Sequence, residues 1–217
     1  MLDELVALIA PPSCGVCAGG CELGRRLCRR CERGLRASAP VWSAVPGVDA
    51  TWSAATYDGA ARSLVGALKF GSRVALAEEA AALIAGRAPA EILDGTIVPV
   101  PPAPLRRRRR GFDSAEAIAS ALGRRTGLPL APCLARTQGR RQVGRRRSER
   151  LADPPSVRAV SPPPSVAVLV DDVMTTGATL GACAEALRGA GATRIAAVTL
   201  AASTAPGPRF GLKASSA

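Results

Sequence analysis

The chain of 217 residues is long enough for one ordinary domain with a small additional module, and its 47% hydrophobic content indicates a folded core. The formal net charge is +12, and residues 101–150 hold 14 arginines against three acidic residues, a local charge of +11. This concentration predicts a polyanionic partner, either a nucleic acid or a phosphorylated small molecule. The sequence contains no histidine, which excludes Ser-His-Asp and Cys-His catalysis and every metal site that needs an imidazole ligand.

The N-terminus reads MLDELVALIA, with acidic residues where a signal peptide needs positive charge and with only a short apolar run. No stretch of the sequence reaches the ~20 apolar residues that a membrane span requires. We therefore expect a cytoplasmic protein with reduced thiols and without membrane insertion.

Residues 13–36 are rich in cysteine, arginine and glycine and show no periodic apolar pattern. They contain two C-x2-C pairs, Cys14 with Cys17 and Cys28 with Cys31, which can supply four thiolates to a tetrahedral Zn²⁺ site. Such a site is structural, because four thiolates leave no open position for catalysis. Disulfides or unpaired cysteines are the alternatives, and Cys21 is a fifth candidate ligand that could replace a neighbour.

Beyond residue 50 the pattern alternates between strands and helices. The predicted strands cover residues 51–57, 96–100, 128–136, 166–170 and 194–201. The predicted helices cover residues 58–71, 72–86, 113–122 and 179–188. Residues 152–165, rich in proline and serine, are expected to form a loop or linker. This alternation predicts an α/β fold with a parallel sheet and helices on both faces. We divide the chain into an N-terminal segment (1–50), a main domain (51–202) and a flexible tail (203–217).

The sequence 166–180, VAVLVDDVMTTGATL, runs from five apolar residues into Asp171 and Asp172. Adjacent carboxylates are costly to bury unless a cation or hydrogen-bond donors meet them, and a surface turn is the alternative. The next residues, 175–179, lead into a helix N-terminus, where free backbone N–H groups favour a phosphate. Because ligands bind at the C-terminal ends of strands in open α/β sheets, the pattern predicts a site for a phosphorylated ribose.

LVDDVMTTGAT resembles the phosphoribosyl pyrophosphate (PRPP) motif of type I phosphoribosyltransferases. The four-cysteine N-terminus, YDGAARSLVGALKFGSR (57–73), IVPVPPAPLRRRRRGFDSAEAIA (97–119) and an arginine-rich loop with Gln142 are similar to the ComF family of competence-associated proteins. The resemblance covers about residues 14–201. It implies a type I phosphoribosyltransferase-like α/β fold with a small N-terminal zinc-ribbon-like module. It also implies a role in natural competence and DNA uptake, and interaction with DNA-uptake or recombination proteins.

The resemblance further implies roles for individual residues. Asp171 and Asp172 would be the catalytic pair, contacting the ribose hydroxyls and a hydrated Mg²⁺. The residues that would cradle the 5′-phosphate are Thr175, Thr176, Gly177, Ala178 and Thr179. Pro101 would belong to the diphosphate-binding loop, and arginines within 136–150 to the hood over the substrate. Purine-specific relatives carry aspartate in place of Thr175, so a purine acceptor is disfavoured.

Two functions remain open at this point. The protein could transfer phosphoribosyl from PRPP to an unidentified acceptor with diphosphate release. Alternatively, it could be a non-enzymatic DNA-binding protein of transformation, in which PRPP is absent or only a regulatory ligand and residues 101–150 contact single- or double-stranded DNA. The run RRRRR (106–110) also fits a solvated basic face, and Arg110 is the member that we expect at the PRPP site.

Overall fold

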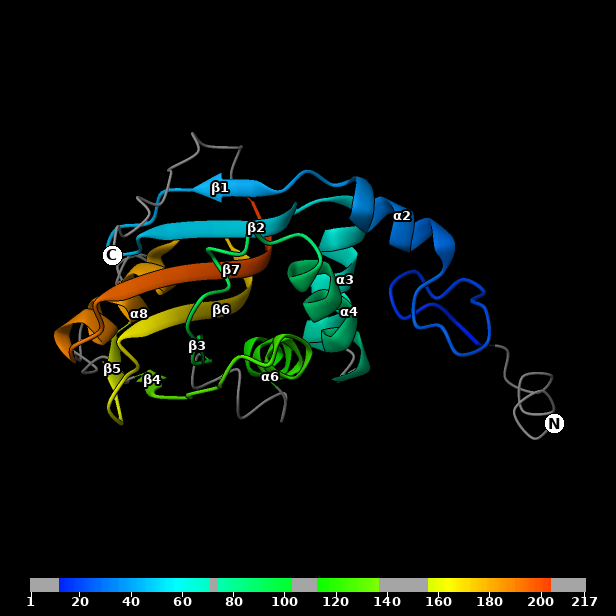
Figure 1. The fold of residues 1–217 in the computed structure, drawn as a ribbon. Helices are drawn as coiled ribbons and strands as arrows, with labels where there is room; N and C mark the ends of the chain where they lie inside the picture. Colours follow the sequence, from blue (N-terminus) through cyan, green and yellow to red (C-terminus); the bar gives the residue numbers. More distant parts are fainter. Residues whose placement is uncertain (1–11, 71–73, 103–112, 137–155, 204–217) are drawn as a thin grey trace, which may run out of the picture.

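The computed structural model describes residues 12–70, 74–102, 113–136 and 156–203. Its central sheet has five strands, which in spatial order are β1 (Val41–Ser43), β2 (Ala50–Thr56), β7 (Arg194–Ala202), β6 (Val166–Met174) and β3 (Thr96–Pro99) (Figure 1). A separate sheet pairs β4 (Leu134–Arg136) with β5 (Val157–Ala159). The helices are α2 (Arg29–Ala37), α3 (Gly59–Phe70), α4 (Val74–Ala85), α6 (Ser114–Thr126) and α8 (Ala178–Gly189).

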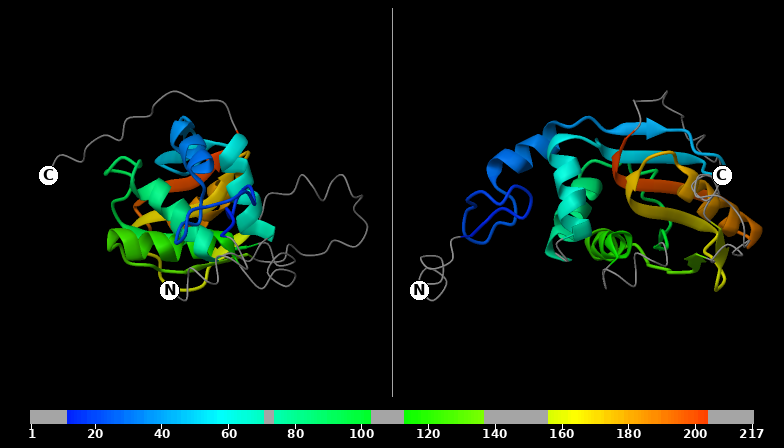
Figure 2. Two further views of the ribbon diagram at one scale, coloured as in Figure 1. Left: turned by 90° about the vertical axis from the view of Figure 1, so that its right-hand side faces the viewer. Right: turned by 180° about the vertical axis from the view of Figure 1, so that it is seen from behind.

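Helices lie on both faces of the central sheet (Figures 1 and 2). Alternate side chains of β6 point to opposite faces: Val168 and Val170 pack in the cluster that includes α3, α4 and α6, whereas Ala167 and Leu169 pack with α8. Strands β2, β7, β6 and β3 are parallel, and only the edge strand β1 runs antiparallel. The predicted α/β fold with a mostly parallel sheet between helices is therefore confirmed.

The strand that carries the aspartate pair is longer than predicted. The prediction ended it at residue 170, whereas β6 continues to Met174 and remains paired with β7. Asp171 lies opposite Thr199 in this pairing, so the two carboxylates belong to the strand itself. Since successive side chains of a strand point to opposite sides, Asp171 and Asp172 face different helices.

Three short elements, α2, β1 and β5, are absent from the sequence-based prediction. Helix α2 buries only Cys31 and Leu35, too few apolar positions among its arginines to produce a visible period. Strand β5 lies in the segment predicted as a loop, and it is stabilised by pairing with β4, which sequence patterns do not reveal. The strand predicted over 128–136 is reduced to β4, with an isolated bridge from Leu130 to Ile97.

Helix α6 begins as predicted but ends later. The side chain of Asp113 accepts hydrogen bonds from two backbone N–H groups of the first turn. The prediction ended the helix at residue 122, whereas α6 continues past Gly123 to a left-handed cap at Gly127 (φ 76°). A Cβ atom on Gly123 would lie 3.2 Å from the carbonyl oxygen of Leu128, so this glycine permits close packing instead of ending the helix.

The guanidinium group of Arg87 ties the end of α2 to the main sheet. It donates to the carbonyl oxygens of Leu35 (3.3 Å), Ser38 (2.8 Å) and Ala54 (2.9 Å). These three acceptors belong to α2, to the residue that follows it, and to β2. A single side chain after α4 therefore joins the N-terminal segment to the domain that carries the pocket described next.

Candidate functional site

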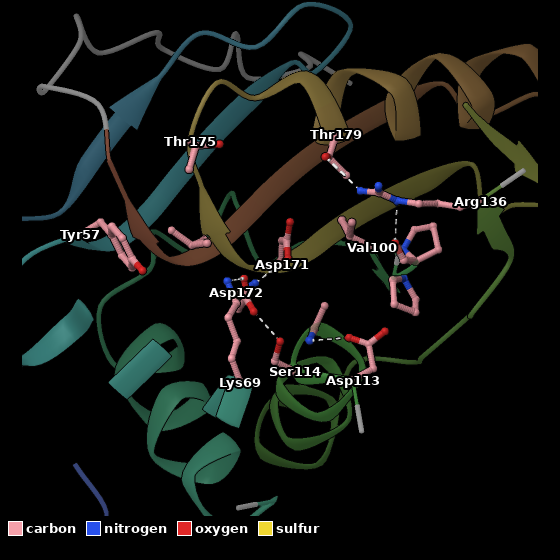
Figure 3. Close-up of a pocket in the computed structure, with 14 residues that line it drawn as sticks. Tyr57, Lys69, Val100, Asp113, Ser114, Arg136, Asp171, Asp172, Thr175 and Thr179 are labelled. Carbon is pink, nitrogen blue, oxygen red and sulfur yellow. Dashed lines mark hydrogen bonds and ion pairs between the residues drawn. The ribbon is translucent and has the colours of Figure 1, made fainter. Parts of the chain in front are cut away.

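A pocket of about 390 Å³ opens beyond the ends of β3 and β6, within the size range of small-molecule sites (Figure 3). Its walls come from segments far apart in the sequence. The lining residues are Tyr57, Lys69, Val100, Pro101, Pro102, Asp113, Ser114, Ala115, Arg136, Asp171, Asp172, Val173, Thr175 and Thr179. The pocket therefore collects Asp171, Asp172, Thr175, Thr179 and Pro101 from the predicted site.

Asp172 forms the floor of this pocket. Within the part of the chain that the structure describes, it is the only charged residue that is fully buried, at 5% exposure. The ammonium nitrogen of Lys69 lies 3.0 Å from its Oδ1, and the hydroxyl of Ser114 donates to its Oδ2 (Figure 3). Lys69 comes from the last turn of α3 and Ser114 from the first turn of α6. Two helices thus hold one carboxylate in place.

Asp171 points to the other side of the strand, and its Oδ1 accepts a hydrogen bond from the backbone N–H of Asp172 (2.7 Å). Burial raises the pKa of Asp171 to about 8, and the adjacent charge of Asp172 adds to this effect. The positive charge of Lys69 acts in the opposite direction. In the ligand-free protein, the carboxyl group of Asp171 therefore holds its proton more tightly than an exposed aspartate does.

The raised pKa of Asp171 makes the stability of the ligand-free protein pH-dependent. The native pKa lies above that of an unfolded aspartate, ~3.9, so the unfolded chain loses its proton first and the free energy of unfolding falls as pH rises from about 4 to 8. The side chain of asparagine does not ionise in this pH range, so it removes this pH dependence of stability. We expect Asp171→Asn to be more stable than the wild type at pH 8 by about 1–3 kcal/mol, with a smaller gain at pH 5.

Urea unfolding of both proteins at pH 5 and pH 8, without divalent cations, measures this difference. Asp94→Asn is a suitable control because Asp94 is 72% exposed in its ion pair with Arg194. An equal effect of Asp171→Asn at the two pH values would show that Asp171 is ionised throughout.

The turn after β6 brings a helix N-terminus to the pocket. Thr175 and Thr179 line the pocket, and residues 176–178 form the turn between them. Gly177 has a φ of 75°, and a Cβ atom there would lie 2.8 Å from a methyl carbon of Val45, so only glycine fits. Gly177 gives helix α8 no side-chain cap; the N–H of Ala178 donates to the hydroxyl of Thr176 (3.4 Å), and the next N–H groups of the first turn are available to an anion.

Arg136 adds a positive charge beside this turn. Its Nε donates to the carbonyl oxygen of Pro101 (3.1 Å) and its guanidinium NH2 group to the hydroxyl of Thr179 (3.1 Å) (Figure 3). The guanidinium therefore connects the turn after β3 with the first turn of α8. A phosphate at the helix N-terminus would lie next to a cation that is already held in place.

The oxygen atoms on the pocket floor suit a hard divalent cation. Mg²⁺ prefers carboxylate oxygen and water ligands, and Asp171 and Asp172 supply two carboxylates to one cavity. Asp113 on the neighbouring wall has a buried oxygen, Oδ2, that finds no partner among the described residues, and burial raises the pKa of its carboxyl group. The donor set therefore fits Mg²⁺.

Sequence reasoning missed several residues that the fold brings to the pocket, above all Lys69, Tyr57 and Ser114. One signal could have pointed to Lys69, since the chain has 27 arginines but only two lysines. In a chain that otherwise uses arginine, a lysine suggests a position where the larger guanidinium group cannot take the same role. Tyr57 is likewise the only tyrosine of the chain.

Other predicted residues lie outside the described part of the chain. They include Arg110 and the rest of 103–112, residues 137–150 of the predicted hood, and the predicted tail apart from Ser203. Among the arginines of residues 101–150 that the structure describes, Arg136 is the one that lines the pocket.

A second site lies in the N-terminal segment, where Cys14, Cys17, Cys28 and Cys31 gather their sulfur atoms within 4.8 Å of one another. The Cys17 and Cys28 sulfurs are 3.7 Å apart, close to the ~3.8 Å edge of a tetrahedron with Zn–S bonds of ~2.3 Å. Burial raises the pKa of Cys14, but backbone N–H groups, chiefly those of Cys17 and Cys28, outweigh it and lower the pKa to about 6. The predicted four-cysteine cluster is confirmed, and its geometry fits Zn²⁺.

The fifth cysteine, Cys21, stands apart from this cluster, and its thiol donates to the carbonyl oxygen of Arg25 (3.3 Å). The cluster also packs on the main domain. Cys14 and Cys31 share a buried core with Leu76 of α4, and a Cβ atom on Gly15 would lie 2.7 Å from a methyl carbon of Leu76. The cysteine cluster and the α/β domain therefore pack against each other.

None of the helices in the described ranges is long and apolar enough to cross a membrane. Residues 108–209 match the family model described as phosphoribosyl transferase domain. This match contains Asp171, Asp172 and the turn to Thr179, whereas Lys69 and the cysteine cluster precede it. The chain matches none of the curated proteins with which it was compared. Residues 108–209 are therefore similar to a phosphoribosyl transferase domain, and the mostly parallel sheet and the position of the pocket agree with that similarity.

Proposed function

We propose that this phosphoribosyltransferase-like protein binds PRPP with Mg²⁺ in the pocket and transfers the phosphoribosyl group to an acceptor, releasing diphosphate. One observation carries the proposal: two adjacent carboxylates and an uncapped helix N-terminus line the same cavity. A ribose 5-phosphate has hydroxyl groups that can bind the two carboxylates and a phosphate that can bind the helix N-terminus. Few other ligands match both features at once.

In this proposal each part of PRPP has its own partners. Asp171 and Asp172 accept hydrogen bonds from the ribose hydroxyls and hold the metal, while the N–H groups and hydroxyls of 175–179 bind the 5′-phosphate. The turn at Pro101, together with Arg110, receives the diphosphate. Bound Mg²⁺ would supply positive charge to the departing diphosphate.

The chemistry needs no covalent intermediate with the protein. The bond between the anomeric carbon and the diphosphate oxygen breaks, and the electron pair leaves with diphosphate while an electron pair of the acceptor forms the new bond. Positive charge develops on the ribose ring, where the carboxylates of Asp171 and Asp172 stabilise it. Arginine side chains around the diphosphate stabilise the negative charge that forms there.

The acceptor is the open part of this function. Thr175, where purine-specific relatives have aspartate, offers no carboxylate to a purine ring, so we expect a different acceptor. Diphosphate release from PRPP, followed with panels of pyrimidines, amines and purines, tests this. Release stimulated by one acceptor supports a transferase, whereas PRPP binding without release under any condition would make PRPP a regulatory ligand.

DNA binding is a second candidate function, supported by the charge of +11 in residues 101–150. The similarity to the ComF family supports a cytoplasmic role in natural competence, where the protein would receive incoming DNA and contact DNA-uptake or recombination proteins. The two functions are compatible, because PRPP and DNA could share the arginines near the pocket.

A variant in the run of arginines can distinguish DNA binding from PRPP binding. We expect replacement of residues 106–109 by serine, with Arg110 retained, to remove most DNA binding and to spare PRPP binding. In the wild type, affinity for DNA should fall steeply with salt, with a log–log slope of about −0.9 per phosphate neutralised on duplex or about −0.7 on single strands. Fluorescence anisotropy at several salt concentrations measures both. Equal loss of DNA and PRPP would assign the run to the small-molecule site. Unchanged DNA binding would mean that the run is only a solvated face or that the cysteine module carries the DNA contact.

A further inference from the structure

The ion pair between Lys69 and Asp172 lies inside the pocket that would bind PRPP. Lys69 is 16% exposed and Asp172 is 7% exposed at their side chains, and 3.0 Å separates the ammonium nitrogen from Oδ1. The hydroxyl of Ser114 donates to the other oxygen, Oδ2. Both oxygens of Asp172 are therefore engaged in the ligand-free protein, and a metal ion that binds Oδ1 has to compete with the ammonium group.

The surroundings explain why a cation is needed at this point. Asp171 and Asp172 are neighbours in the sequence, and the negative charge of Asp172 contributes to the raised pKa of Asp171. Among the described residues that line the pocket, Lys69 and Arg136 carry the positive charge. Arg136 is held away from the carboxylate pair by its hydrogen bonds to Pro101 and Thr179. Lys69 is thus the cation available to the carboxylate pair.

We infer that Lys69 is a built-in counter-ion that occupies the magnesium position at Asp172 until PRPP and Mg²⁺ arrive together. The inference rests on the proposed function. Binding of the metal displaces the ammonium group from Oδ1, and the flexible four-carbon side chain swings to the diphosphate of PRPP, towards the Pro101 and Pro102 wall of the same pocket. Lys69 therefore opposes Mg²⁺ alone and assists Mg²⁺ bound to PRPP.

This dual role gives Lys69→Met two effects of opposite sign. Without the ammonium group, Oδ1 of Asp172 is open, so Mg²⁺ alone should bind about tenfold more tightly than to the wild type. PRPP in saturating Mg²⁺ should bind about tenfold more weakly, because the diphosphate loses a cation. A general disturbance of the pocket would weaken both ligands and cannot produce this pattern.

The experiment uses calorimetric titration of the full chain with Mg²⁺ alone and, separately, with PRPP in saturating Mg²⁺. Lys69→Arg keeps the charge and should stay near the wild type in the Mg²⁺ titration. Asp171→Asn identifies heat that comes from this site. Arg124→Met is the matched control, because it removes one positive charge from an exposed ion pair with Glu78, outside the pocket lining. It should leave both affinities unchanged.

Unchanged or weaker Mg²⁺ binding by Lys69→Met would overturn the counter-ion role. Tighter Mg²⁺ binding with unchanged PRPP binding would overturn the transfer to diphosphate. If the wild type binds no PRPP, the proposed function fails and the diphosphate part falls with it, while the titration with Mg²⁺ alone still decides whether Lys69 occupies the metal position.

Discussion

Replacement of Asp172 by asparagine should lower the affinity for PRPP with Mg²⁺ about 100-fold and leave the fold intact. The buried carboxylate would bind the ribose hydroxyls and the metal, and loss of charge-assisted hydrogen bonds of this kind costs about 1.5–3 kcal/mol. The fold should tolerate the change, since the amide oxygen of asparagine can still accept from Ser114 and the repulsion between the two carboxylates disappears. Calorimetric titration of PRPP into both proteins measures the effect.

The matched control for this variant is Asp94→Asn, which removes one carboxylate from an exposed ion pair with Arg194. It should bind PRPP as the wild type does. If Asp172→Asn keeps wild-type affinity for PRPP while circular dichroism shows a folded protein, the aspartate pair is not the ribose and metal site.

The double replacement Cys14→Ser with Cys17→Ser should reduce the zinc content from about one ion per chain to none. Two of the four ligands are lost, and a structural zinc contributes on the order of 10 kcal/mol to the fold of a small metal module. Because Cys14 and Cys31 share a buried core with Leu76, the loss should reach the α/β domain and lower its melting temperature by about 10 °C or more. Elemental analysis and thermal unfolding measure the two effects.

Cys21→Ser provides the control in the same segment, because the Cys21 thiol contacts the carbonyl oxygen of Arg25 and lies outside the cluster. It should retain zinc and melt near the wild-type temperature. Full zinc content in the double variant would refute the assignment of Cys14 and Cys17 as ligands.

The parts of the fold with a strong local signal could be predicted from the sequence. The apolar runs of β6 and β7, the cap at Asp113 and the spacing of the four cysteines each carry their structure in a few neighbouring residues. The turn before α8 is also signalled locally, since Gly177 has a φ of 75°, which glycine adopts readily.

The remaining features depend on contacts between distant segments. Lys69 follows Leu68 in an ordinary amphipathic helix, and only the packing of α3 against the sheet, where it contacts β7, brings Lys69 to Asp172, 103 positions later in the sequence. Strand β5 exists because β4 pairs with it, and its own residues predict a loop. The raised pKa of Asp171 likewise arises from burial, which the sequence alone does not give.

Titration of the wild-type protein with PRPP in the presence of Mg²⁺ tests the central claim most directly. The account predicts saturable heat with one site per chain, with an affinity that falls about 100-fold in Asp172→Asn and is weaker for ribose 5-phosphate, which lacks the diphosphate. A folded, zinc-loaded wild-type protein that gives no heat with PRPP and Mg²⁺ would contradict the account.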